Sequence, residues 1–265
     1  MHSGLTGRGG ICYSVGNSAK LGENAMLLFY VRHGYPTYDP DCLTPLGRRQ
    51  ADAVAKRLAL YGIDRVFASS STRAIQTAQP TCELMRIGMT VLDWCHESRA
   101  WEEYAYPDPA DQAVRWDFTT PSMQKLYASP EMRALGDNWL SHPIFAGRKT
   151  AQGEARIRRE THAFLAELGY RYDPEIRMYR AERPHNTDRV ALFAHEGFGM
   201  AFLSQVLDIP RPLFCTHFGM SHSNMTVLHF DENAPEVLPR VLTLSNDSHL
   251  YREGLPTFYQ NRIYF

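Results

Sequence analysis

Charged side chains and imidazoles follow four apolar segments of the sequence, each at the point where a strand is expected to end. An arginine-histidine pair ends the first segment, an arginine follows the second, a glutamate the third and a histidine the fourth. Each of these groups binds or transfers protons or anions. They are Arg32 and His33 after MLLFYV, Arg73 after DRVFAS, Glu97 after MTVLDW and His195 after DRVALFA.

This combination of side chains suits the transfer of a phosphoryl group. Two guanidinium forks bind a tetrahedral dianion through parallel N–H donors, which supplies the charge neutralisation that Mg²⁺ supplies elsewhere. A neutral imidazole can attack phosphorus, and a second, protonated imidazole can donate to the equatorial oxygens. A carboxylic acid can protonate the departing alkoxide. No metal is required for such a reaction.

The elements that must position these groups alternate between strand and helix. This order predicts an α/β fold with a doubly covered, mostly parallel sheet, whose ligands bind outside the carboxyl ends of the strands. The first helix is expected to begin with Thr44 as N-cap and Pro45 in its first turn, and to end at Gly62. Further helices are expected over 70–88 (kinked or divided at Pro80), 153–172 and 196–209, and two final strands over 221–230 and 239–246 at one edge of the sheet.

The chain of 265 residues suits one domain over 26–265. Residues 98–150 are rich in Trp, Tyr, Pro and Asp, and they are expected to form an insertion over the sheet that serves as a lid or cap. Residues 1–25, rich in Gly, Ser and Asn, are expected to be a flexible N-terminal extension.

Composition excludes several classes of partner. With 28 basic and 29 acidic residues, the formal charge of −1 favours neither nucleic acid nor an anionic membrane surface. No run of 18 apolar residues is present, so no membrane span is expected. Five cysteines without a C-x-x-C pair indicate neither a disulfide framework nor a thiolate zinc site, and they point to the cytoplasm. The oligomeric state is not indicated.

Three motifs together resemble the histidine phosphatase superfamily, also called phosphoglycerate mutase-like. They are RHG after the first strand, SSSTRAIQTA after the second and AHEGFG after a late strand. The resemblance implies an enzyme that hydrolyses a small phosphorylated substrate without a cofactor. It implies that His33 is the phosphorylated nucleophile, that Arg32 and Arg73 hold the phosphoryl oxygens, that His195 is the second histidine, and that Glu97 is the proton donor.

Several alternatives stay open at this point. Glu102 competes with Glu97 as proton donor, because the segment ESRAWEEY departs from the family's usual pattern. A buried Arg32 needs an anionic partner, either a bound phosphate or a structural Asp, and Glu196 is expected to cap the helix that follows it. Phosphoglycerate mutase activity ranks below hydrolysis, since RHGYPTY lacks the Ser and the Trp-Asn pair of known mutases. A non-catalytic phosphate-binding or interaction module is the third function.

Overall fold

A six-stranded sheet forms the centre of the molecule in the computed structural model, which describes residues 25–108, 110–183, 185–231, 234–257 and 259. All of its strands run in one direction except β11, which is antiparallel to both of its neighbours. The predicted mostly parallel α/β fold is therefore confirmed. The strand order is β13-β11-β1-β10-β4-β5, and the strands span Ala25–Arg32 (β1), Arg65–Ser69 (β4), Met89–Leu92 (β5), Arg189–Ala194 (β10), Met225–Asp231 (β11) and Arg240–Asn246 (β13).

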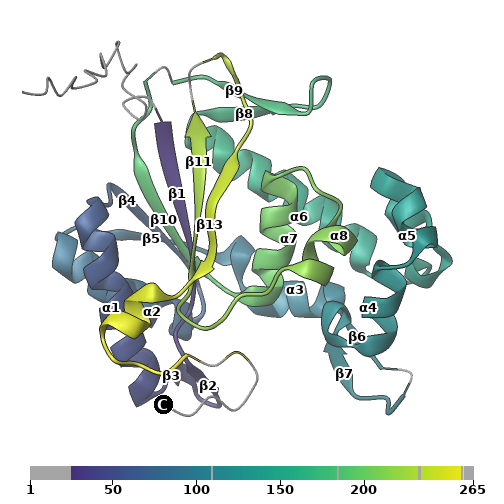
Figure 1. Cartoon of the computed structure of the whole chain (residues 1–265), viewed down its shortest axis with the longest axis horizontal. Helices are drawn as coiled ribbons and strands as arrows, with labels where there is room; N and C mark the ends of the chain where they lie inside the picture. The colour runs from purple at the N-terminus through teal and green to yellow at the C-terminus, as the bar shows by residue number, and fades with distance from the viewer. Residues whose placement is uncertain (1–24, 109, 184, 232–233, 258, 260–265) are drawn as a thin grey trace, which may run out of the picture.

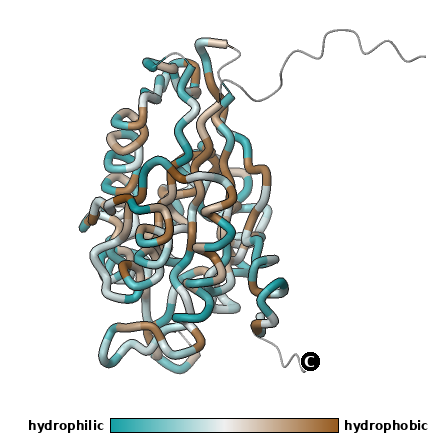
Figure 2. Tube along the Cα trace, turned by 90° about the vertical axis from the view of Figure 1, so that its left-hand side faces the viewer, coloured by the Kyte–Doolittle hydropathy of each residue, from teal (hydrophilic) through white to brown (hydrophobic). Residues whose placement is uncertain are grey.

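Helices cover both faces of the sheet, as Figure 1 shows. Side chains of β1 alternate between the two resulting cores, since Leu28 and Tyr30 pack in one and Phe29 and Val31 in the other. Hydrophobic stretches accordingly run along the strands in Figure 2. One face carries α1 (Pro45–Tyr61), α2 (Thr72–Met85) and α9 (Ser248–Arg252), and the other carries α3 (Glu97–Tyr104), α6 (Thr150–Glu167), α7 (Glu196–Val206) and α8 (Arg211–His217).

The helix ends of α1 follow the sequence prediction. The Thr44 side chain accepts a hydrogen bond from Gly47 N at 3.1 Å, Pro45 is the first helical residue, and Gly62 ends the helix with a φ of 73°. Helix α2 is continuous through Pro80 and ends at Met85, so the alternative that Pro80 divides the helix is wrong. The lost backbone hydrogen bond is tolerated where buried neighbours hold the helix against the sheet.

The predicted helix over 153–172 was wrong at both ends. Helix α6 begins at Thr150 and ends at Glu167, because Gly169 takes a left-handed φ of 98° that stops the helix. The chain then forms a second sheet of three antiparallel strands, in the order β12-β9-β8, which was not predicted from the sequence. They span Tyr170–Asp173 (β8), Met178–Ala181 (β9) and Glu236–Val237 (β12).

The segment 98–150 packs against α6, α7 and α8 and consists of short elements (Figure 1). A buried ion pair fastens it there, because both Arg211 Nη atoms bond the carboxylate of Asp117, at 2.7 and 2.8 Å. Its elements beyond α3 are β6 (Ala105–Pro107), β7 (Val114–Trp116), η2 (Asp117–Thr119), α4 (Pro121–Tyr127), α5 (Pro130–Leu135), η3 (Gly136–Ser141) and η4 (Pro143–Phe145).

Two short elements stand close to the strand ends: the hairpin of β2 (Pro36–Tyr38) and β3 (Asp41–Leu43), and the turn η1 (Asp93–Cys95). The predicted N-terminal extension lies outside the described residues, apart from Ala25, with which β1 begins. Among the helices of the described ranges, none has the length and apolar character needed to cross a bilayer.

Candidate active site

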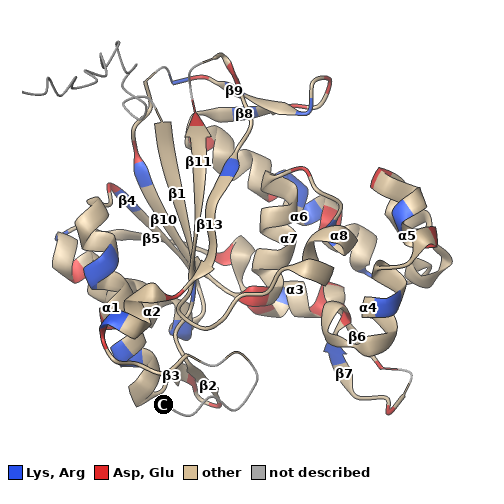
Figure 3. Ribbon diagram, viewed as in Figure 1, with Lys and Arg blue, Asp and Glu red and all other residues tan. Residues whose placement is uncertain are grey.

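A cavity of about 500 Å³ opens at the carboxyl ends of β1 and β4. A parallel sheet is expected to place a ligand at this position. Acidic and basic segments lie together at this lower end of the sheet in Figure 3. Four of the five predicted site residues line the cavity, and the fifth, His195, is buried beside it. The lining residues are Arg32, His33, Arg73 and Glu97, together with Tyr38, His96, Ser98, Trp101, Trp116 and Glu196.

His33 presents its Nε2 atom toward Arg73. The guanidinium of Arg73 donates from Nε to His33 Nε2 at 3.2 Å, and His33 Nδ1 lies 2.8 Å from Gly34 O. Because a guanidinium only donates, Nε2 is the unprotonated nitrogen and Nδ1–H is the donor to Gly34 O. Burial and the neighbouring charges lower the pKa of His33 well below its usual value. The imidazole is therefore neutral, with a lone pair on Nε2, which is the form a nucleophile needs.

Gly34 allows this close approach of the chain to the start of α1. A Cβ atom at residue 34 would lie 2.6 Å from Gly47 O, so any larger residue would push the loop away. The Gly34 N–H donates to Thr77 Oγ1 of α2 at 3.0 Å. These contacts explain why a buried strand ends on Arg32-His33-Gly34: the glycine turns the chain where helices α1 and α2 confine it.

Arg73 joins both predicted histidines from the first turn of α2. Besides His33, its Nη2 donates to His195 Nδ1 at 3.2 Å. Its Nη1 bonds Asp41 Oδ1 at 2.7 Å, and the other oxygen of Asp41 accepts from Thr72 N at 2.9 Å. Asp41 therefore fixes the guanidinium and the start of α2 together. Asp41 was not predicted as a site residue, because it lies in the β2–β3 hairpin, away from any strand end of the central sheet.

His195, which joins the end of β10 to the start of α7, is fully buried. Because Arg73 only donates, Nδ1 of His195 is the acceptor and Nε2 carries the proton. The Nε2–H group donates to Ser69 Oγ at 2.8 Å. Tyr30 holds the backbone of His195, donating from Oη to His195 O at 2.5 Å and accepting from His195 N at 3.2 Å. Burial, followed by the Arg73 charge, lowers the pKa of His195 well below its usual value.

Arg32 has an anionic partner within the protein, and that partner is Glu196. Arg32 Nη1 lies 2.9 Å from Glu196 Oε2 and also bonds Met220 O, while Nη2 contacts His222 Nε2 at 3.0 Å. The expected capping role of Glu196 was wrong in this respect, because its carboxylate faces Arg32. The buried Nε of Arg32 has no hydrogen-bond partner among the described residues.

Glu97, the first residue of α3, reaches across to the start of α7. Its two carboxylate oxygens accept hydrogen bonds from Gly197 N and Phe198 N, both at 3.0 Å. Desolvation outweighs these donors and raises the pKa of Glu97 to about 7. Glu102, the alternative proton donor, is exposed and does not line the cavity. Of these two carboxyl groups only Glu97 lines the cavity, and its raised pKa favours the protonated form that a proton donor needs.

Three further histidines lie in different parts of the structure. His222 contacts Arg32 at 3.0 Å and His217 contacts Arg133 at 3.1 Å, both through Nε2, whereas His229 belongs to β11. Within the described ranges, no group of three or more His, Cys, Asp or Glu side chains is placed to hold a metal ion. His222 was missed as a site residue, since only its loop brings it to Arg32.

Comparison with known proteins shows a family similarity over the N-terminal part of the described chain. The family model of the histidine phosphatase superfamily (branch 1) matches residues 28–122, which contain Arg32, His33, Arg73 and Glu97. No curated protein sequence matches the chain.

Several solved structures are similar to the chain over most of its length. A mycobacterial glucosyl-3-phosphoglycerate phosphatase has a TM-score of 0.53 at 19% identity, covering 83% of this chain and 99% of that chain. Its complex with inorganic phosphate has a TM-score of 0.53 at 19% identity, covering 84% and 98%. Phosphoserine phosphatase from Entamoeba histolytica, with 3-phosphoglyceric acid, has a TM-score of 0.52 at 16% identity, covering 85% and 99%. At these identities the likeness establishes the fold.

Proposed function

Because the chain is a member of the histidine phosphatase superfamily, we propose that it is a metal-independent phosphomonoester hydrolase that acts on a small phosphorylated metabolite. The reaction proceeds through a phosphohistidine at His33. One observation carries this proposal: Arg73 bonds the facing nitrogens of His33 and His195, each at 3.2 Å, and it lines one cavity with Arg32 and Glu97.

In the first step, His33 Nε2 attacks the phosphorus atom of the bound ester. The P–O bond to the alcohol breaks, and Glu97 gives its proton to the departing oxygen. Arg32 and Arg73 turn their donors to the phosphoryl oxygens and so stabilise the developing charge. The product is the free alcohol and a phosphoryl group on His33.

In the second step, water hydrolyses the phosphoenzyme. The Glu97 carboxylate accepts the proton of the attacking water, the P–N bond breaks, and inorganic phosphate leaves. His195 is neutral in the empty site, because burial and the Arg73 charge oppose its protonation. A dianionic substrate reverses this electrostatic balance, so His195 takes up a proton and donates to the phosphoryl group.

The compartment is proposed on the state of the thiols. The four cysteines within the described ranges are free, namely Cys42, Cys82, Cys95 and Cys215, which supports action in the reducing cytoplasm.

Hydrolysis of p-nitrophenyl phosphate in the presence of EDTA tests the proposal. The wild-type chain is expected to turn over, and His33→Ala to lose activity by at least about a thousandfold, because the nucleophile is gone. His217→Ala, which removes an exposed histidine that contacts Arg133, is the matched control and retains full activity. Activity that disappears with EDTA, or that survives in His33→Ala, would contradict the mechanism.

The same protein preparation can be used to test the two alternative functions, phosphoglycerate mutase and non-catalytic binding module. Conversion of 3-phosphoglycerate to 2-phosphoglycerate, faster than release of phosphate, would identify a mutase. Tight binding of phosphate esters without turnover, unaffected by His33→Ala, would identify a binding module.

A further inference from the structure

The cavity has more room than a phosphoryl group needs, and aromatic rings line the remainder. Its volume is about 500 Å³. A cavity of this size is typical of a site for a small organic molecule. Beyond His33, Arg73 and Glu97, three rings form part of the wall. We call Tyr38, Trp101 and Trp116 the aromatic rim.

Trp116 lies directly against Gly197, the residue whose backbone N–H donates to Glu97. A Cβ atom at Gly197 would be 2.3 Å from the Trp116 ring, so the ring covers the glycine whose N–H donates to Glu97. The ring of Trp101 stands perpendicular to that of Trp116, with centroids 5.0 Å apart, and Trp101 is 38% exposed. An alcohol that receives its proton from Glu97 therefore departs past these two rings.

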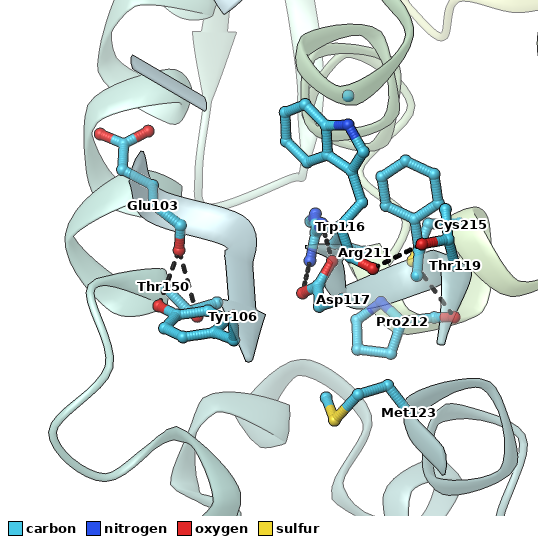
Figure 4. A network of polar contacts seen from close by, with 12 residues as sticks. Glu103, Tyr106, Trp116, Asp117, Thr119, Met123, Thr150, Arg211, Pro212 and Cys215 are labelled. Atoms are coloured by element: carbon cyan, nitrogen blue, oxygen red, sulfur yellow. Dashed lines mark hydrogen bonds and ion pairs between the residues drawn. The ribbon is translucent and has the colours of Figure 1, made fainter. Parts of the chain in front are cut away.

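The position of Trp116 is fixed by the buried contacts of the next residue in the chain. The next residue, Asp117, is buried and bonds both Nη atoms of Arg211, and it also accepts from Tyr127 Oη at 2.6 Å. Figure 4 shows this ion pair below the Trp116 indole. The Trp116 part of the rim is consequently formed before a ligand arrives, which lowers the entropic cost of binding a flat group.

The charges on the wall disfavour an anionic leaving group. The two lining guanidinium groups already have carboxylate partners, Glu196 for Arg32 and Asp41 for Arg73. Glu196 itself lines the cavity, so a carboxylate on the alcohol would face a like charge. A second cavity of about 480 Å³ shares Arg32 and Glu196 with the first, but Glu97 does not line it. The leaving alcohol therefore belongs on the side of the aromatic rim.

We propose that this site selects phosphate monoesters of uncharged alcohols that carry a flat apolar group, and that Trp101 and Trp116 are the residues that determine this specificity. The proposal rests on the phosphatase function proposed above. It goes further by naming the class of leaving group, which the phosphoryl-binding residues alone do not define.

Three esters of unactivated primary alcohols separate the two parts of the proposal. Benzyl phosphate carries a flat apolar group, glycerol 1-phosphate a small neutral one, and 3-phosphoglycerate replaces the terminal hydroxymethyl group of the latter by a carboxylate. We expect kcat/KM to be highest for benzyl phosphate and at least about tenfold lower for 3-phosphoglycerate than for glycerol 1-phosphate. Release of inorganic phosphate at pH 7 with EDTA is the readout.

Substitution of the exposed rim residue tests the role of the rings. Trp101→Ala is expected to lower the preference for benzyl phosphate over glycerol 1-phosphate by about twofold to tenfold, mainly through KM, as one lost aromatic contact implies. Trp101→Phe restores most of this preference. Tyr251→Ala removes an aromatic side chain that is 86% exposed and outside the cavity, and it leaves the preference unchanged.

Inhibition by phosphonates gives a readout that does not depend on turnover. Benzylphosphonate should inhibit p-nitrophenyl phosphate hydrolysis more strongly than methylphosphonate, and Trp101→Ala should reduce the difference. Equal use of all three esters, or an unchanged benzyl preference in Trp101→Ala, would overturn the inference while leaving the phosphatase function in place. Failure to hydrolyse any ester, p-nitrophenyl phosphate included, would overturn the proposed function itself.

Discussion

Replacing Glu97 by glutamine should remove the proton that accompanies the leaving alcohol while keeping the arginines and imidazoles in place. The pKa of Glu97 is raised to about 7 by desolvation. In the free enzyme the acid form then amounts to about half of the molecules at pH 7 and about a tenth at pH 8. Because the protonated form is the active one in the first step, kcat/KM must fall as pH rises through 7.

The size of the effect depends on how much the leaving group needs the proton. A general acid contributes roughly 10²–10⁴ in rate, so the ratio of wild-type to Glu97→Gln kcat/KM should reach that range for glycerol 1-phosphate at pH 6. The ratio should then decrease by about tenfold for each pH unit above 7. For p-nitrophenyl phosphate, whose phenolate leaves without protonation, the ratio should stay below about ten.

The assay is phosphate release from both esters between pH 6 and 9. Ionisation of the substrate affects both enzymes equally, so it cancels in the ratio. Glu102→Gln, which alters an exposed carboxylate outside the cavity, is the matched control and should change kcat/KM by less than about twofold. A ratio that is independent of pH, or equal for the two esters, would refute the assignment of Glu97 as proton donor.

The remaining predictions concern charged contacts around the site. Arg32→Lys should lower kcat/KM by about a hundredfold or more, because an ammonium group cannot make the two parallel hydrogen bonds of a guanidinium. Near-normal activity would contradict the role of Arg32 in holding the phosphoryl oxygens. Asp41→Asn should lower kcat/KM by about tenfold, because the ion pair that holds Arg73 is weakened, while the circular dichroism spectrum should stay unchanged. An unaltered kcat/KM would show that Asp41 does not position Arg73. Arg211→Met leaves Asp117 buried and without its ion-pair partner. Urea denaturation should therefore show a loss of about 3–5 kcal/mol, and a loss under about 1 kcal/mol would refute the pairing.

The convergence of Arg32, His33, Arg73 and His195 could be predicted from sequence for a simple geometric reason. Each lies at or just after the carboxyl end of a parallel strand of the sheet, and parallel strands end on the same side. The location of the cavity could therefore be predicted from the order of apolar segments and helices in the sequence.

Residues contributed by loops could not be placed in this way. Asp41 reaches Arg73 from a hairpin, and His222 reaches Arg32 from a loop before β11, so both depend on tertiary packing. The pairing of Glu196 with Arg32 was likewise missed, because a carboxylate at the start of a helix is equally typical of a capping residue. The choice between Glu97 and Glu102 needed the packing of α3 against α7.

Detection of the phosphoryl group on His33 tests the central claim most directly. Glu97→Gln treated with p-nitrophenyl phosphate should accumulate the intermediate, because the phenolate leaves without the acid while hydrolysis lacks its base. Mass spectrometry of a rapid quench should show one phosphoryl group per chain, labile to acid, stable to base, and confined to the peptide that contains His33. Absence of the label, or its appearance on another residue, would contradict the account.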